Sequence, residues 1–219
     1  MIIREQFSTS LSVLKEEVLN LGSMAEEALS ETLKAVSIND SDKLNVIITN
    51  DRVINNKELM INENATLLIT KQQPVASDLR KVIVSLKISS DLERIGDLSV
   101  DIAKAALRIN ESIGGQGFEQ EIQRMGARTN EMLKAVLSAY REGDVLEAQK
   151  IAAIDDEIDK AYGEFVQSLF KTAVLEPGVI ENITQLAFIS RYIERIADYS
   201  TNIAEWIIYE VNGRRFDLN

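Results

Sequence analysis

Residues that break helices are rare in this sequence and fall at wide, regular intervals. The 219 residues include only 10 Gly and 2 Pro, about half the number that an average chain of this length contains. Breaking residues gather at 39–42, 72–74, 111–117, 143–144 and 177–178. Between these clusters, apolar residues recur at helical spacing over roughly 25–35 residues. The pattern predicts an all-α fold of six long antiparallel helices.

The two halves of the sequence are copies of each other. Seven of the eleven residues from 93 to 103 recur 101 positions later, and Pro74 recurs as Pro177. The motif LKAV at 33–36 recurs at 133–136, an offset of 100. Small drifts in the offset indicate short insertions at the turns, as a duplication predicts. The duplication therefore predicts two tandem three-helix bundles.

A stretch with three glycines, 111–117, is the best linker between the two copies. We expect the first bundle repeat to comprise residues 1–110 and the second to comprise residues 118–219. The third helix of each copy shows which of its faces is core, because its apolar residues step by three and four. These stripes are Ile88, Leu92, Ile95, Ser99, Ile102, Ala106 and Ile109, and Ile189, Ile193, Ile196, Ser200, Ile203 and Ile207.

Charge and missing residue types exclude several functions. Lys and Arg number 24 and Asp and Glu 35, for a net charge of −11, and no basic run is long enough to bind nucleic acid. Without His or Cys the chain has no imidazole base and no thiolate metal site. No apolar run reaches 18 residues and the start does not resemble a signal peptide, so we expect a cytoplasmic protein without membrane insertion.

Acidic residues recur at four-residue spacing on the third helix of each copy. Glu93, Asp97 and Asp101 fall one turn apart on one line, opposite the apolar stripe. The second copy repeats the row as Glu194, Asp198 and Asn202. Like charges at this spacing destabilise a helix by roughly 0.2–0.5 kcal/mol per pair. We therefore expect a positive group to offset the repulsion.

A second pair of rows follows the edge of the apolar stripe on the second helix of each copy. The rows are Asp51, Asn55 and Glu58, and Asp155, Asp159 and Tyr162. Two rows on adjacent helices can supply the oxygen ligands that Mg²⁺, Mn²⁺, Ca²⁺ or an iron ion prefers. The predicted ligands of such a divalent or trivalent metal are Asp51, Glu58, Glu93, Asp97, Asp101, Asp155, Asp159, Glu194, Asp198 and Asn202.

Three other interpretations of the acidic rows stay open at this stage. The rows can be ordinary solvated helix faces that Arg94 and Arg195 help to neutralise. A carboxylate-bridged di-iron enzyme is a second interpretation, although such sites typically draw on Glu-x-x-His motifs and the chain has no His. A coiled-coil or membrane-surface protein is a third, although a surface-seeking helix needs a basic face.

Three longer motifs resemble the PhoU family of phosphate-transport regulators. They are QPVASDLR at 73–80, DLERIGD at 91–97 and YIERIAD at 192–198. The similarity extends over essentially the whole chain, including the duplication and the breaks. It implies a cytoplasmic, homodimeric, non-enzymatic adaptor between the ATPase subunit of the Pst phosphate ABC transporter and a sensor histidine kinase. Such a protein restrains phosphate uptake and silences the phosphate-starvation response.

The resemblance also implies that the acidic motifs bind metal ions on the bundle surface. Three positions depart from the family pattern. Asn55 stands where the family usually has Asp, Tyr162 takes the second-copy place of Glu58, and Tyr199 stands where His is frequent. These changes remove ligand atoms, so the two sites need not have equal affinity. An alternative within the family is a metal-binding paralogue that serves another transporter.

Overall fold

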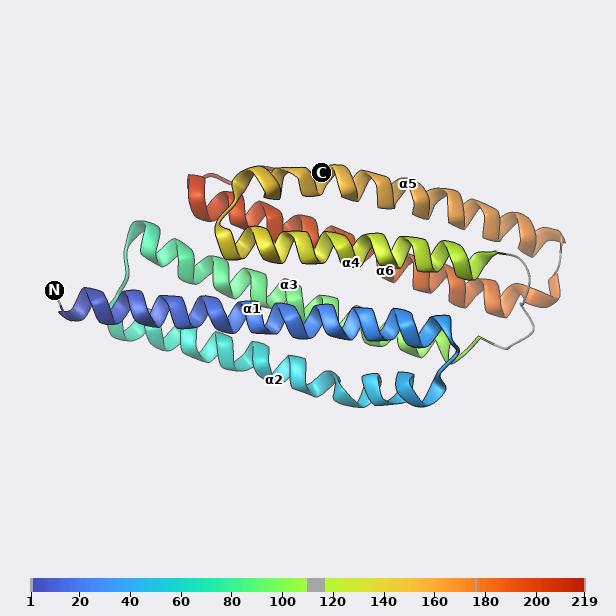
Figure 1. Ribbon diagram of the computed structural model, residues 1–219, viewed down its shortest axis with the longest axis horizontal. Helices are drawn as coiled ribbons and strands as arrows, with labels where there is room; N and C mark the ends of the chain where they lie inside the picture. Colours follow the sequence, from blue (N-terminus) through green and yellow to red (C-terminus); the bar gives the residue numbers. More distant parts are fainter. Residues whose placement is uncertain (1, 110–116, 176, 219) are drawn as a thin grey trace.

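The computed structural model describes residues 2–109, 117–175 and 177–218. Over these ranges the chain forms six long helices and no strand (Figure 1), so the all-α prediction is confirmed. The helices are α1 (Ile2–Ser37), α2 (Ser41–Gln72), α3 (Ala76–Ala106), α4 (Phe118–Glu142), α5 (Val145–Leu175) and α6 (Ile180–Asn212). Of the predicted linker 111–117, only Gly117 lies within the described residues, where it precedes α4 with φ +74°.

Five of the helices end close to the breaks that the sequence predicts, where local groups satisfy free backbone donors and acceptors. The third helix was expected to reach about residue 110, but α3 ends at Ala106, so Ile109 of the predicted stripe lies beyond the helix. Asp40 caps α2, its carboxylate accepting the Lys43 N–H at 2.9 Å. Gln73 closes the same helix in a left-handed conformation. Gly143 and Gly213 close α4 and α6 with φ of +68° and +72°, a region that glycine adopts without strain.

Two three-helix layers lie side by side and share one core (Figure 1). α3 packs against α6 and α1 against α4 along the seam between the copies. α2 and α5 lie outermost, α2 against α1 and α3, and α5 against α4 and α6. Most core residues of both copies form one continuous cluster, and Ala35, Leu44, Ile47, Val100 and Ala103 form a smaller one between α1, α2 and α3. The division into 1–110 and 118–219 stays a prediction about the repeats.

The predicted heptad stripes form the centre of this core. Ile88, Leu92 and Ile95 are fully buried, as are their counterparts on α6. The duplicated serines of the stripe are buried too. Ser99 donates to the Ile95 carbonyl and Ser200 to the Ile196 carbonyl, both at 2.9 Å. The serines are therefore small seam residues whose hydroxyls are satisfied within their own helices.

Two glycine–leucine contacts set the spacing of α1 and α4 and correct the register of the repeat. A Cβ on Gly126 would lie 2.4 Å from a methyl group of Leu33, and one on Gly22 would lie 2.4 Å from a methyl group of Leu137. Both pairs are related by an offset of 104. The match at offset 100 is therefore one helical turn out of structural register. A shift of four residues presents nearly the same helix face, so a short motif does not distinguish the two.

Enlarging Gly126 tests this contact directly. We expect Gly126→Leu to lower the free energy of unfolding by about 2–3 kcal/mol, because the new side chain forces α1 and α4 apart. Gly163→Leu on α5 is the matched control, since a Cβ there meets nothing within 4 Å. Urea unfolding followed by circular dichroism measures both variants. Equal losses at the two positions would contradict the packing described here.

Candidate metal centre

Three aspartates of the second copy converge where α5 packs against α6. Asp155 and Asp159 lie one turn apart on α5, and Asp198 projects from α6. One carboxylate oxygen from each lies within 4.8 Å of the other two. Asp155 is only 3% exposed, whereas Asp159 is exposed. Asp155 therefore forms the buried side of the triad and Asp159 its solvent-exposed side, and the oxygens of the triad could hold a metal ion.

The charges of this triad are poorly compensated by the chain itself. Within the described residues, Asp155 Oδ1 and Glu194 Oε2 are buried and have no hydrogen-bond partner. Burial raises the pKa of Asp155 to about 6. Burial, followed by the charge of Asp198, raises the pKa of Glu194 to about 7. Burial and then Asp159 also raise the pKa of Asp198. A cation at the triad would offset all three effects.

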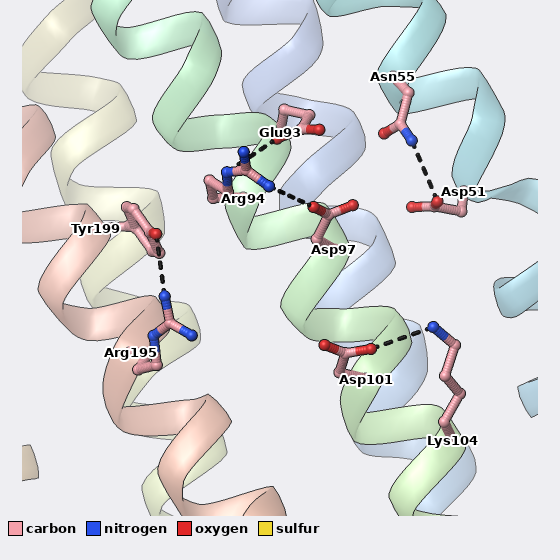
Figure 2. A network of polar contacts seen from close by, with 9 residues as sticks. All are labelled: Asp51, Asn55, Glu93, Arg94, Asp97, Asp101, Lys104, Arg195 and Tyr199. Carbon is pink, nitrogen blue, oxygen red and sulfur yellow. Dashed lines mark hydrogen bonds and ion pairs between the residues drawn. The ribbon is translucent and has the colours of Figure 1, made fainter.

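Two arginines help to neutralise the second row: Arg195, as the sequence suggested, and Arg191, and both act to lower the pKa of Asp198. Arg191 pairs with Glu194, three residues along α6. Arg195 donates to the Tyr199 hydroxyl at 3.2 Å (Figure 2). The Arg191 guanidinium lies over the ring of Tyr162, 5.8 Å from its centre. Tyr162 therefore positions the arginine beside the row rather than adding an oxygen ligand to it.

The first copy also brings acids of α2 and α3 near one another, although within the described residues only the three aspartates of the second copy have carboxylate oxygens all within 4.8 Å of one another. Burial, followed by the charge of Asp97, raises the pKa of Asp51, and the same two causes in the same order raise the pKa of Glu93. The two rows therefore face each other rather than diverging into solvent. Within the described residues, Asp51 Oδ1 and Asn55 Oδ1 are buried without a hydrogen-bond partner, which is a second sign of a place for a cation.

The first site nevertheless differs from the second in its charge balance (Figure 2). The Asn55 amide donates to Asp51 at 3.2 Å. The counterpart of Asn55 in the second copy is Asp159, which has a carboxylate at this position. Arg94 binds Asp97 at 3.1 Å and approaches Glu93 at 3.6 Å, and Lys104 binds Asp101 at 3.2 Å. The first copy thus has a neutral amide where the second has the Asp159 carboxylate, and Arg94 and Lys104 each pair with one of its acids.

The predicted ligands on α3 differ in how far their side chains are exposed to solvent. The side chains of Glu93, Asp97 and Asp101 are 20%, 34% and 41% exposed. The sequence placed this row opposite the apolar stripe, but α3 lies in the middle of the molecule, so the opposite face packs along α2 instead of facing water. Asp101 lies nearest the solvent and turns to Lys104.

Two predicted ligands lie at a different place from the triads. Glu58 and Asn202 line a hollow of about 490 Å³ between α2, α3 and α6, together with Asp91, Trp206 and Arg215. Glu58 still approaches Glu93 closely enough for its charge to raise the pKa of that carboxyl.

Comparison with known proteins identifies the family. The model of the PhoU domain matches the chain twice, at residues 18–106 and 122–207. The chain belongs to the PhoU family. The phosphate-specific transport system accessory protein PhoU homolog of Clostridium acetobutylicum is 36% identical over 217 residues, 99% of each chain. The Escherichia coli accessory protein PhoU is 35% identical over 214 residues, 98% of this chain and 88% of that one.

Solved PhoU structures share the fold over nearly the whole chain. The phosphate transport system regulatory protein PhoU of Streptococcus pneumoniae superposes with a TM-score of 0.87 at 31% identity, over 96% of this chain and 99% of that one. PhoU of Pseudomonas aeruginosa gives a TM-score of 0.91 at 29% identity, over 95% of this chain and the whole of that one. None of the described helices combines the length and apolar composition that a membrane span requires.

Proposed function

We propose that this PhoU-family protein is a non-enzymatic, cytoplasmic regulator of phosphate uptake. It acts as an adaptor between the ATPase subunit of a Pst-type phosphate transporter and a sensor histidine kinase, and it represses the phosphate-starvation response. The observation that carries the proposal is the near full-length similarity to proteins named as accessory to the phosphate-specific transport system. The absence of His and Cys from the sequence supports a non-catalytic role.

The metal-binding part of the proposal is supported by buried carboxylate oxygens of the acidic rows that have no hydrogen-bond partner within the described residues. Asp155, Asp159 and Asp198 would hold a hard cation in the second copy, and Asp51, Glu93 and Asp97 in the first. When bound, the ion supplies the positive charge that these oxygens lack. Mg²⁺, Mn²⁺, Ca²⁺ and iron ions all accept such ligands.

The chain's own residues then have separate tasks at each site. Asp155 and Glu194 form the buried side of the second site, where an uncompensated charge costs most. Arg94 and Arg191 each offset part of one row. A bound ion would relieve the remaining repulsion between the carboxylates and so would hold α5 against α6 and α2 against α3. The acidic surface of the bundle thereby becomes a rigid face for a protein partner.

Deleting the gene in its host tests the regulatory role. We expect uptake of labelled phosphate in phosphate-rich medium to rise above the wild-type rate, because the restraint on the transporter is lost, and to return to normal when the gene is restored. Cross-linking in phosphate-rich cells should join the protein to the transporter ATPase. Unchanged uptake together with no cross-link to the ATPase or to a kinase would contradict the proposal.

The alternative within the family is a paralogue that serves a different transporter. It predicts unchanged phosphate uptake and a cross-link to the ATPase subunit of another system. The same deletion strain and the same cross-linked sample therefore distinguish the two proposals.

A further inference from the structure

The segment that follows α6, residues 213–218, folds back onto that helix. Gly213 turns the chain in the left-handed region, with φ +72°. Residues 214–217 are exposed, while the Leu218 side chain packs against the main core cluster. We call residues 213–218 the return segment. Its hydrogen bonds to α6 meet at one acidic side chain, Glu205.

Glu205 is a buried acid whose two oxygens both accept from the return segment. Its residue is only 5% exposed. The Arg215 guanidinium donates to Oε2 at 3.3 Å, and the backbone N–H of Leu218 donates to Oε1 at 2.9 Å. If these donors left and nothing replaced them, a buried carboxylate would remain uncompensated, which is strongly unfavourable. Glu205 therefore needs a donor group from outside its own helix.

Trp206, the next residue on α6, provides the other half of the contact. The Arg215 guanidinium lies 4.8 Å from the centre of the Trp206 ring. A guanidinium is planar, so it can lie against an aromatic ring while its N–H groups bind a carboxylate. Glu205 and Trp206 thus hold Arg215 in the way that a binding site holds an arginine ligand.

The first copy shows that the fold does not require this acid and this ring. The buried stripes of α3 and α6 match at an offset of 101. At that offset, Glu205 and Trp206 correspond to Lys104 and Ala105. Lys104 is exposed and pairs with Asp101 on its own helix. The buried acid and the ring are therefore particular to the second copy.

A hollow of about 490 Å³ adjoins the contact and offers room for an incoming side chain. Asp91, Trp206 and Arg215 are among the residues that line it. Within the described residues, Asp91 Oδ2 is buried and has no hydrogen-bond partner. Burial raises the pKa of Asp91, and the charge of Glu205 raises it further, whereas Arg215 lowers it. A guanidinium has five N–H donors, enough to serve both acids.

The arginine that fills the site is much less buried than the acid that needs it. The Arg215 side chain is 60% exposed, against 7% for Glu205, and the return segment forms neither helix nor strand. An exposed cation adds little stability of its own. The return segment can therefore leave at small cost, provided that another guanidinium takes its place at Glu205. This combination favours an exchangeable ligand on a fixed site.

We propose that Asp91, Glu205 and Trp206 form a binding site for an arginine-bearing segment of a partner protein, and that the return segment occupies this site until the partner displaces it. The partner segment would carry an arginine and, three residues later, an apolar residue, as Arg215 and Leu218 do. The proposal rests on the adaptor role for its partner. Its test needs neither the transporter nor a phosphate signal, so it can fail while the proposed function stands.

A peptide of residues 213–219 with blocked ends is the probe. The full-length variant Arg215→Ala with Leu218→Ala, which we call the released variant, removes both side-chain anchors of the return segment. Trp206 is the only Trp of the chain, so its fluorescence reports on the site. We expect saturable binding to the released variant and at least about 10-fold weaker binding to wild type, where the attached segment competes at a millimolar effective concentration.

Altered peptides separate recognition of one arginine from general attraction to an acidic protein. Arg215→Ala in the peptide should abolish binding. Arg214→Ala removes the same charge but should leave the affinity within about threefold, since Arg214 is exposed. Equal losses with the two peptides would overturn the proposal. Arginine amide alone should bind at least about 10-fold more weakly than the peptide. Equal affinity would assign the site to a small guanidinium compound and overturn the proposed partner.

Glu205→Gln in the released variant tests the acid itself. The change keeps the size of the side chain and removes its charge, so we expect the affinity for the peptide to fall at least about 10-fold. Glu210→Gln, at a half-buried position of the same helix, is the matched control and should bind as before. Circular dichroism checks that each variant is folded. If the released variant unfolds, Arg215→Ala alone takes its place.

Three results would overturn the proposal. One is a folded released variant that does not bind the peptide. Another is equal affinity of the peptide for wild type and for the released variant, because the return segment would then not occupy the site. The third is peptide binding that survives Glu205→Gln.

Discussion

We expect Asp155→Asn to lower the affinity of the proposed α5–α6 site for Mn²⁺ by about 100-fold, which corresponds to roughly 3 kcal/mol. The expected loss is large because Asp155 is 3% exposed and its Oδ1 atom has no hydrogen-bond partner within the described residues. A contact with the Thr201 side chain offsets only part of the cost of burying this charge, since the pKa of Asp155 is still raised to about 6. Isothermal titration of the metal-free protein with Mn²⁺ measures the effect.

Asp156→Asn is the matched control for this variant. It makes the same change in charge one residue away, but Asp156 is exposed and lies about 100° around α5 from Asp155, so it should leave the affinity within about twofold. The first copy allows the reciprocal change. Asn55→Asp adds the carboxylate that Asp159 provides in the second copy and should raise the affinity of the α2–α3 site. Equal effects of Asp155→Asn and Asp156→Asn would contradict the assignment.

We expect the stability of the metal-free protein to fall as the pH rises from 5 to 7, with the largest single contribution from Asp91. Burial raises the pKa of Asp91 to about 7 in the folded protein, whereas an unfolded Asp has a pKa of about 3.9. Between these values the folded state binds more protons than the unfolded state, so the free energy of unfolding falls as the pH rises. Above the folded pKa the contribution of Asp91 no longer changes.

Asp91→Asn isolates this contribution, which is on the order of 3 kcal/mol between pH 4 and pH 7. The variant should show a shallower pH dependence and a higher stability than wild type at pH 7. Asp156→Asn should keep the wild-type slope. Urea unfolding at a series of pH values in the presence of a chelator provides the measurement. An unchanged slope in Asp91→Asn would show that its carboxyl is not protonated in the folded protein.

Added metal should separate Asp91 from the acidic sites. Burial also raises the pKa values of Asp155 and Glu194, so in the absence of metal these groups add to the same slope. Saturating Mn²⁺ should remove the contribution of Asp155 and Glu194 to the pH dependence of stability, because the cation stabilises their charged carboxylates. The part from Asp91 should persist, since this residue lies in the hollow beside Trp206 rather than in a triad.

The sequence predicted the fold well because helix length and phase are local properties. Clusters such as 39–42 and 72–74 stop a helix whatever packs around it. The steps of three and four at Ile88, Leu92 and Ile95 fix which face is buried. The duplication then predicted the arrangement of the second bundle from the first, although the LKAV motif did not show the structural offset.

The details of the sites depended on neighbours that helix phase does not reveal. The four-residue spacing gave the same prediction for Asp155 and Asp159, yet packing against α6 buries Asp155 and leaves Asp159 exposed to solvent. Arg191, rather than Arg195, pairs with Glu194, a choice made by side-chain direction on α6. Arg215 lies with its guanidinium 4.8 Å from the centre of the Trp206 ring and donates to the buried Glu205, contacts that no local sequence pattern indicates. Such contacts depend on how the tail folds back.

The core face of α2 is again a local property. Ile47, Ile54 and Ile61 recur at a spacing of seven, and all three are buried.

Locating the metal itself tests the central claim most directly. Crystals grown with Mn²⁺ would show the ion by anomalous scattering. The account predicts an anomalous peak between the carboxylates of Asp155, Asp159 and Asp198, and a weaker or absent peak beside Asp51 and Asp97. Peaks only at other acidic surfaces, or no peak near the triad at saturating Mn²⁺, would contradict it.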